Sequence, residues 1–128
     1  MTVIITDSGF STDDWPVLYG RADILEISSD FEFRALKTVI THKTAIRIEF
    51  PHFTDGRGFG IAKILRASGF VGCLRAFGDV LPDQFAMARR VGFDEIEITD
   101  DHATRFPEAQ WLYRSRWATH DYQQKLQA

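Results

Sequence analysis

The feature that most constrains the fold is a regular alternation of strand-like and helix-like segments between residues 22 and 98. Four short apolar segments have the composition of strands, and the segments between them place apolar residues at helical spacing. Strands separated by single helices form right-handed βαβ units, which build a parallel sheet. The sequence therefore predicts an α/β fold with four βα units. The predicted strands are Ala22–Ile27, Thr44–Phe50, Val71–Phe77 and Phe93–Ile98.

The segments between these strands contain signals that begin and end helices. Ser29 and Glu32 form a capping box, in which each side chain satisfies the backbone N–H of the other residue. Gly69 and Gly92 follow the second and third predicted helices, where a glycine commonly ends a helix. A short helical turn is expected after Ser11, and core packing is expected for the aromatic residues of the last helix. The predicted helices are one that opens at Ser29, Phe59–Ser68, Leu81–Val91 and about Pro107–Gln124, the last with Trp111, Tyr113, Trp117 and Tyr122.

Two arrangements of the four units are compatible with this pattern. Four βα units equal half of an eight-stranded βα barrel, and they can also form an open, flavodoxin-like sheet. A half barrel would leave two bare sheet edges, which must be covered or paired. The aromatic final helix could cover one edge, or it could form a contact between two copies of the chain, so a homodimer is one expectation.

The composition is that of a single globular domain spanning residues 1–128. Apolar residues make up 45% of the chain, which argues against disorder. No apolar run approaches the roughly 20 residues of a membrane helix, and the N-terminus lacks the basic residues of a secretory signal. A single cysteine, Cys73, allows no internal disulfide, so a cytoplasmic location is expected.

The net charge of −3 conceals an uneven distribution. Residues 1–32 carry seven acidic side chains and one basic one, residues 33–92 carry ten basic and four acidic ones, and residues 93–128 carry seven acidic and four basic ones. The basic middle contains the glycine-rich loops and could attract a small anion to them. The alternative is that Lys and Arg side chains simply coat solvated helices. Because the chain has no run of basic residues, nucleic acid is not an expected partner.

The strongest candidate site is the segment Phe50–Phe59 (FPHFTDGRGF), which joins the second predicted strand to its helix. In parallel βα folds, ligands bind at the loops that follow the carboxyl ends of the strands. Gly56 and Gly58 permit a tight turn and a close approach of the backbone to a ligand, and Arg57 can hold an oxyanion with two hydrogen bonds. The helix N-terminus also favours an anion. We therefore predict ligand binding by His52, Gly56, Arg57 and Gly58, and the alternative is a helix start with an Asp55 cap and two turn glycines.

A second group of candidates follows the third predicted strand, where Arg75, Gly78 and Asp79 occur. The side chains of Arg75 and Phe77 should face the same side of the sheet, because strand residues alternate between faces. Asp79 would then stand on the loop next to that of Asp55. Together, Asp55, Arg57, Arg75 and Asp79 could form an internal ion-pair network, or an acid/base pair with an anion clamp. In the second case Asp55 and Asp79 would be catalytic, and Arg75 and Gly78 would contribute to ligand binding. A simple N-cap of the third helix is the commonest role for Asp79.

No motif identifies a metal ion or a cofactor. His52 and Asp55 lie three residues apart in a loop, which is a weak spacing for metal ligands, and no second histidine pair supports a metal site. The glycine-rich loop lacks the spacing of a nucleotide-binding motif, so the cofactor is left unassigned. Cys73 lies mid-strand without a partner histidine and is expected to be a buried small side chain. The remaining histidines, His42, His102 and His120, are expected on the surface.

Three strings, FPHFTDGRGF, LRASGFVGCLRAFGDVLPDQ and GFDEIEI, resemble a bacterial family of uncharacterised proteins. The resemblance extends from Asp23 to Ile98. Members of this family are often labelled oxidoreductases of sulfite reduction, and their genes commonly lie beside those for assimilatory sulfite reductase. The resemblance implies a role in that pathway but supplies no catalytic residues. Two positions depart from the family: Gly60 stands where relatives often have a hydroxyl residue, and Cys73 stands where they often have Glu.

These observations favour one function over two others. The first is an accessory protein of assimilatory sulfate and sulfite reduction that binds a small oxyanion or the reductase itself, at the loops after the parallel strands. The second is an enzyme that uses the Asp/Arg cluster in a barrel-like opening. The third is a structural protein that dimerises through its free sheet edges without catalysis.

Overall fold

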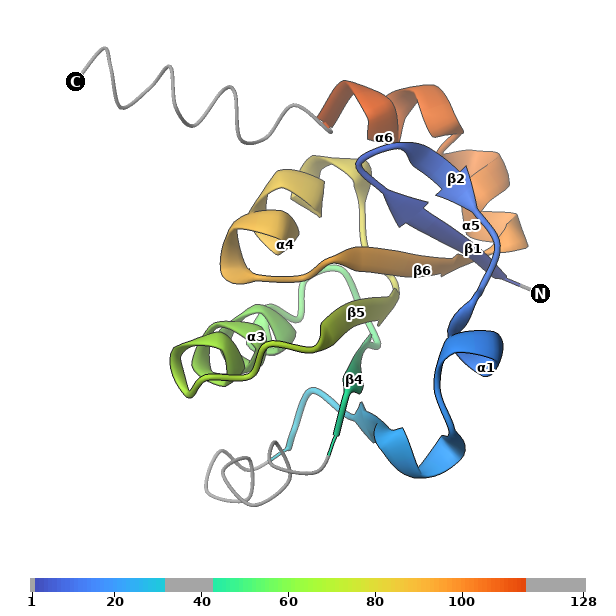
Figure 1. The fold of residues 1–128 in the computed structure, drawn as a ribbon. Helices are drawn as coiled ribbons and strands as arrows, with labels where there is room; N and C mark the ends of the chain where they lie inside the picture. The colour runs from blue at the N-terminus through green and yellow to red at the C-terminus, as the bar shows by residue number, and fades with distance from the viewer. Residues whose placement is uncertain (1, 32–42, 115–128) are drawn as a thin grey trace, which may run out of the picture.

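The computed structural model describes residues 2–31 and 43–114, which contain a six-stranded sheet in the order β2-β1-β6-β5-β4-β3 (Figure 1). The four strands from β3 to β6 are parallel, and β1 and β2 are antiparallel to their neighbours. The predicted α/β fold with a parallel sheet is therefore confirmed, and each predicted strand overlaps an observed one. The strands are β1 (Thr2–Thr6), β2 (Gly9–Ser11), β3 (Ile24–Ile27), β4 (Ala45–Phe50), β5 (Cys73–Gly78) and β6 (Glu95–Thr99).

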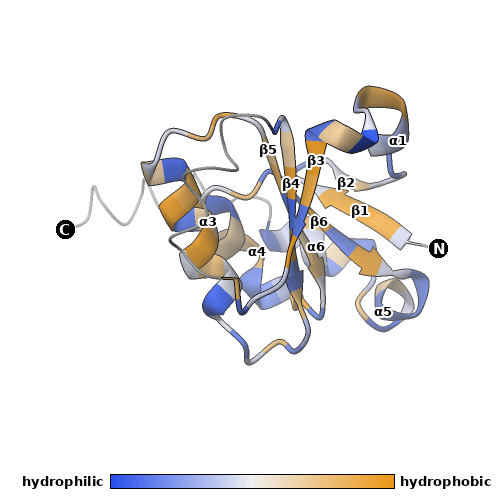
Figure 2. Ribbon diagram, turned by 90° about the horizontal axis from the view of Figure 1, so that it is seen from below, coloured by the Kyte–Doolittle hydropathy of each residue, from blue (hydrophilic) through white to orange (hydrophobic). Residues whose placement is uncertain are grey.

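The parallel strands lie side by side in the order of the sequence, as they do in a segment of a βα barrel. A flavodoxin-like sheet would have its strands in a different order. Since right-handed crossovers that progress in one direction place their helices on one face, α3 (Arg57–Ala67) and α4 (Phe85–Val91) cover the same side of the sheet (Figure 2). The sheet remains open, with β2 and β3 at its edges.

The β1–β2 hairpin was not predicted. It adds two strands to the sheet beside β6, and its Ile4 and Ile5 are fully buried. The turn of the hairpin, Asp7 and Ser8, leads into Gly9, the first residue of β2, whose φ of +108° is a conformation that favours glycine. The segment that follows (residues 12–23) contains α1 (Trp15–Leu18) and the 3₁₀ turn η1 (Arg21–Asp23), and it lies on the opposite face of the sheet from α3 (Figure 2). Helix α1 confirms the helical turn expected after Ser11.

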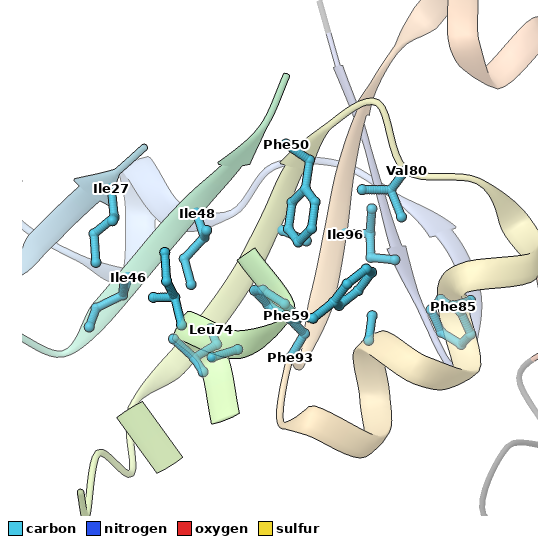
Figure 3. Packing of buried hydrophobic residues seen from close by; sticks show 14 of the residues in the cluster. Ile27, Ile46, Ile48, Phe50, Phe59, Leu74, Val80, Phe85, Phe93 and Ile96 are labelled. Atoms are coloured by element: carbon cyan, nitrogen blue, oxygen red, sulfur yellow. The ribbon is translucent and has the colours of Figure 1, made fainter. Parts of the chain in front are cut away.

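The apolar core lies between the sheet and the helices α3 and α4 (Figure 3). Alternation along β4 directs Ile46, Ile48 and Phe50 into this core, where Phe50 contacts Phe59 with ring centroids 4.9 Å apart. Gly58 makes this contact possible, because a Cβ at that position would lie 2.5 Å from the Phe50 ring. The glycine predicted to approach a ligand therefore allows the helix to pack closely on its strand.

The predicted helices are confirmed where the structure describes them, with altered boundaries. Helix α3 begins two residues earlier than expected and is followed by Gly69 with φ +98°. The third predicted helix begins as the 3₁₀ turn η3 (Pro82–Gln84) before α4. After β6 come two short helices, α5 (Asp100–Arg105) and α6 (Glu108–Arg114), and α6 buries Trp111 in the core as expected while Tyr113 remains exposed. The helix expected after Ser29, and the continuation beyond residue 114 with Trp117 and Tyr122, lie outside the described residues.

Candidate functional site

The segment between β4 and α3, here called the β4–α3 loop (Pro51–Gly56), lies at the carboxyl end of the parallel strands. Most of its side chains are exposed to solvent. Phe53 is 40% exposed, and its ring stacks on that of His52 with centroids 4.7 Å apart and an interplanar angle of 25°. The loop therefore presents an aromatic pair at the surface.

The backbone of this exposed loop is held in place by side chains from the segment that follows β5, namely Asp79 and, in η3, Gln84. The N–H of Phe53 donates to Asp79 Oδ2 at 3.0 Å, and Gln84 Nε2 donates to the Phe53 carbonyl at 2.8 Å. Gly78 has φ +119°, and a Cβ there would lie 2.4 Å from the Phe50 carbonyl oxygen. This glycine allows β5 to end beside Phe50, and the N–H of Asp79 then donates to the Phe50 carbonyl at 2.9 Å. Asp79 is thus positioned to fix the β4–α3 loop.

Asp55 and Arg57 bind each other. Arg57 donates from Nε to Asp55 Oδ1 at 2.9 Å and from Nη2 to Oδ2 at 2.8 Å, and its backbone N–H also donates to Oδ1. The hydroxyl of the buried Ser29, after β3, donates to Oδ2 at 2.9 Å. Hydrogen bonds from Arg57 hold the pKa of Asp55 well below its usual value, and Asp55 raises the pKa of Arg57. The carboxylate of Asp55 therefore occupies the helix start and neutralises the arginine that was predicted to bind a ligand.

Gly56 is not required by the local structure. A Cβ added to this residue would have no other atom within 4 Å, and its φ is negative. Neither packing nor backbone geometry therefore demands glycine at this position.

Arg75 does not join Asp55, Arg57 and Asp79, so the predicted four-residue cluster does not form. Its side chain is 1% exposed and lies on the polar face of the sheet, under α1. There the guanidinium stacks on Trp15, 4.0 Å from the ring centroid, and pairs with Asp13, Glu95 and Glu97 at 2.9–3.1 Å. Burial acts to raise the pKa of Asp13. The hydrogen bonds that Asp13 accepts from Arg75 and from the Trp15 backbone N–H outweigh this effect and hold the pKa below its usual value.

The polar face carries a group of paired charges that we call the arginine cluster: Arg47, Arg75, Glu95 and Glu97. Arg47 Nη1 donates to Glu97 at 3.0 Å, its Nη2 lies 2.7 Å from Glu26, and its guanidinium stacks on Phe77 at 4.2 Å. Phe77 thus shares a face with Arg75, as the alternation predicted. The sequence interpretation missed this cluster as a unit. The signal for it in the sequence was that charged residues alternate with apolar ones in β4 (Arg47, Glu49) and in β6 (Glu95, Glu97), while β5 between them carries the single charge of Arg75.

The prediction that His102 lies on the surface is wrong. Its side chain is buried, with Nε2 2.8 Å from the Val80 carbonyl oxygen and Nδ1 3.8 Å from Asp79 Oδ1. Because a carbonyl can only accept, Nε2 carries the proton in this contact. Thr99 caps α5 by accepting the N–H of His102, and this cap turns the imidazole inward against Phe106.

Cys73 is half-buried on the polar face, 3.4 Å from Glu95 Oε1. Burial, together with the carboxylate of Glu95, raises the pKa of its thiol well above the usual value. A nucleophilic or redox-active cysteine needs the opposite shift. Within residues 2–31 and 43–114, no group of three or more side chains of the metal-binding types is close enough to hold an ion. None of the helices in that part of the chain has the length and apolarity to cross a membrane.

The fold and this loop define a small α/β protein of consecutive βα units, with an exposed and internally braced loop at the carboxyl ends of its strands. Residues 25–128 match the family described as "Bacterial protein of unknown function (DUF934)", and the chain belongs to that family. This confirms the resemblance to a bacterial family of uncharacterised proteins. No curated protein and no solved structure matched the chain. The β1–β2 hairpin and α1 precede the matched residues.

Proposed function

We propose that this chain is a non-catalytic accessory protein of assimilatory sulfite reduction, which binds the sulfite reductase through the β4–α3 loop. The pathway is taken from the family resemblance described above. The observation that supports binding at this loop is that most of its residues are exposed while its backbone is fixed by side chains of the segment that follows β5.

This combination suits a surface that recognises another protein. A loop that is ordered before binding loses less conformational entropy when the partner binds. Asp79 and Gln84 hold the backbone of Phe53, although the Phe53 side chain itself contributes to no buried core. Exposed aromatic residues often provide much of the binding energy at interfaces. The stacked rings of His52 and Phe53 therefore form the centre of the proposed contact.

Binding of a small oxyanion at the same loop has less support from the geometry. The cation that would hold the oxyanion, Arg57, is already bound at two nitrogens by Asp55. Asp55 is ionised at every physiological pH, so an oxyanion would have to displace it. We expect no heat when the protein is titrated with millimolar sulfite, sulfate or phosphate. Heat that disappears in an Arg57→Gln variant would instead support oxyanion binding.

Catalysis by Asp55 and Asp79 is the alternative enzymatic function, and it can be separated from a positioning role. Asp79 accepts the Phe53 N–H, and an asparagine could accept the same hydrogen bond through its amide oxygen. We therefore expect Asp79→Asn to support growth on sulfate as the sole sulfur source, and Asp79→Ala to impair it. If both variants fail to support growth while remaining folded, the carboxylate itself is required and the enzymatic function is favoured.

A purely structural role through dimerisation would use the sheet edges. The β2 edge is partly covered, because the Phe10 N–H donates to Glu108 of α6 at 2.8 Å. The β3 edge would then be the contact surface. Light scattering at high protein concentration distinguishes this role: a monomer argues against it, and a dimer that is lost when β3 carries a proline at Leu25 supports it.

The test of the proposed function is a direct binding measurement. The purified full-length chain is immobilised, and the assimilatory sulfite reductase of the same organism is passed over it in biolayer interferometry. We expect saturable binding that Phe53→Ser weakens at least about tenfold, as expected for a residue at the centre of an interface. No binding at micromolar reductase, or equal binding by the variant, would refute the proposal.

Val71→Ser is the matched control. Val71 is 94% exposed and precedes β5, at the end of the sheet opposite to the β4–α3 loop. This substitution removes a similar exposed apolar side chain, so it should leave the affinity for the reductase unchanged. A loss of affinity in this variant would show that binding depends on general surface hydrophobicity.

A further inference from the structure

The polar face contains a cavity of about 330 Å³ that the proposed function does not use. It lies between the sheet and the segment 12–23, and its size is within the range of pockets for small organic molecules. Arg47 and Arg75 line it from the sheet, and Arg21 lines it from η1. Trp15, Tyr19 and Ile24 provide an apolar wall. The cavity therefore offers both cationic and apolar surface to a ligand.

The cations that line this cavity differ in how completely they are paired. Arg75 is buried and bound by Asp13, Glu95 and Glu97, so it is part of the fixed structure. Arg47 is held on one side by Glu97 and on its ring face by Phe77. Its remaining nitrogen, Nη2, pairs with Glu26, whose side chain is 67% exposed. An ion pair this exposed is weak, because water and salt screen it.

Glu26 thus occupies a position that an external carboxylate could take. The side chain can leave without breaking any interaction of the core, since it lies at the rim of the cavity. A smaller hollow of about 90 Å³ is also lined by Glu26 and Arg47, which gives the displaced side chain room to move. Arg47 is held rigid by Glu97 and Phe77, so its planar guanidinium is ordered before a ligand arrives.

We propose that this cavity binds a small organic monocarboxylate, whose carboxylate replaces that of Glu26 on Arg47 and approaches Arg21, and whose apolar body lies against Tyr19 and Ile24. Asp13 also lines the cavity, so a second negative charge on the ligand would be repelled. The carboxylate could belong to an amino acid or to the corresponding acid without an amino group. If the carboxylate of Asp13 pairs with the ammonium group of an amino acid, the amino acid binds more tightly than its desamino analogue.

Binding is tested by titration of the isotope-labelled protein with 3-phenylpropionate, 4-methylpentanoate, L-phenylalanine and L-leucine at millimolar concentration. The reporter is the indole N–H signal of Trp15, which lines the cavity and donates a hydrogen bond to Glu95. We expect at least one of these carboxylates to shift that signal, and phenethylamine and glutarate to leave it unchanged. The comparison of each amino acid with its desamino analogue identifies the source of the carboxylate. No shift with any of the four carboxylates, or an equal shift with phenethylamine, would overturn the proposal.

Two variants give opposite effects only if the proposal is correct. Glu26→Gln removes the internal competitor and should tighten binding several-fold, while Arg21→Gln should weaken it several-fold. Both residues are exposed, so neither change should unfold the protein, and the amide spectrum verifies this. Arg105→Gln is the control, because Arg105 is an exposed arginine that does not line the cavity. Weaker binding in Glu26→Gln would contradict the proposal that the ligand's carboxylate replaces that of Glu26 on Arg47.

The cavity lies on the sheet face and the β4–α3 loop lies beyond the strand ends, so this inference and the proposed function can fail independently.

Discussion

Replacement of Arg75 by methionine should destabilise the protein strongly. Arg75 is 1% exposed and bridges Glu97, which is 3% exposed, and Glu95. Removal of one partner from a buried ion pair typically costs about 3–5 kcal/mol, because the remaining charge is left buried. Here Glu97 retains Arg47 and Glu95 retains the Trp15 indole N–H, so we expect a loss near the lower limit, about 3 kcal/mol in the free energy of unfolding.

Urea unfolding followed by circular dichroism measures this loss. Arg105→Met is the matched control, because Arg105 pairs with Asp101 on the surface of α5 and such exposed pairs contribute about 0.3–0.5 kcal/mol. The double variant Arg75→Met/Glu97→Leu should recover part of the stability, since it removes the buried carboxylate together with its partner. A loss below about 1 kcal/mol for Arg75→Met would refute the claim that the arginine cluster stabilises the polar face.

Single contacts give three further predictions. Gly78→Ala should destabilise the protein by at least about 2 kcal/mol in urea unfolding, because the new Cβ would meet the Phe50 carbonyl oxygen at a positive φ. Cys73 should react with iodoacetamide much more slowly in the native protein than in urea at pH 8, because its raised pKa suppresses the thiolate; equal rates would contradict this. His102→Leu should lower the free energy of unfolding by about 1–3 kcal/mol, because it leaves the Val80 carbonyl without its buried donor, and an unchanged urea midpoint would show that the carbonyl finds another partner.

The fold was predictable from the sequence where one physical signal dominated. Apolar periodicity located the strands β3 to β6. Gly69 and Gly92 located the C-terminal ends of α3 and α4, and Pro82 located the start of η3. The β1–β2 hairpin was missed because its two strands are short and its stability depends on a distant partner. Phe10 is bonded to Glu108 from α6, a contact between residues 98 positions apart that local patterns do not contain.

The candidate site was only partly predictable, for a reason that Arg75 illustrates. Period-two alternation correctly placed Arg75 and Phe77 on one face, but it does not say which face the helices cover. Which face the helices cover depends on the handedness and direction of the crossovers. These crossovers put α3 and α4 on the face of Leu74 and Ala76 and leave Arg75 on the other face. His102 was misplaced for a related reason: a polar residue was assumed to be exposed, whereas the Thr99 cap directs it inward to a backbone acceptor.

The arginines Arg57 and Arg47 each bind a carboxylate, and the surroundings of that carboxylate decide which of them can accept a ligand. Asp55 accepts four hydrogen bonds, three from Arg57 and one from Ser29, so an external anion that binds Arg57 must displace a carboxylate held by all four. Glu26 contributes a single exposed contact to Arg47 and is easily exchanged. This contrast favours small-molecule binding at the polar face and protein binding at the β4–α3 loop. Since the two surfaces share no residue, a Phe53→Ser/Arg21→Gln double variant should show both single defects at unchanged size, and a larger combined defect would reveal coupling between them.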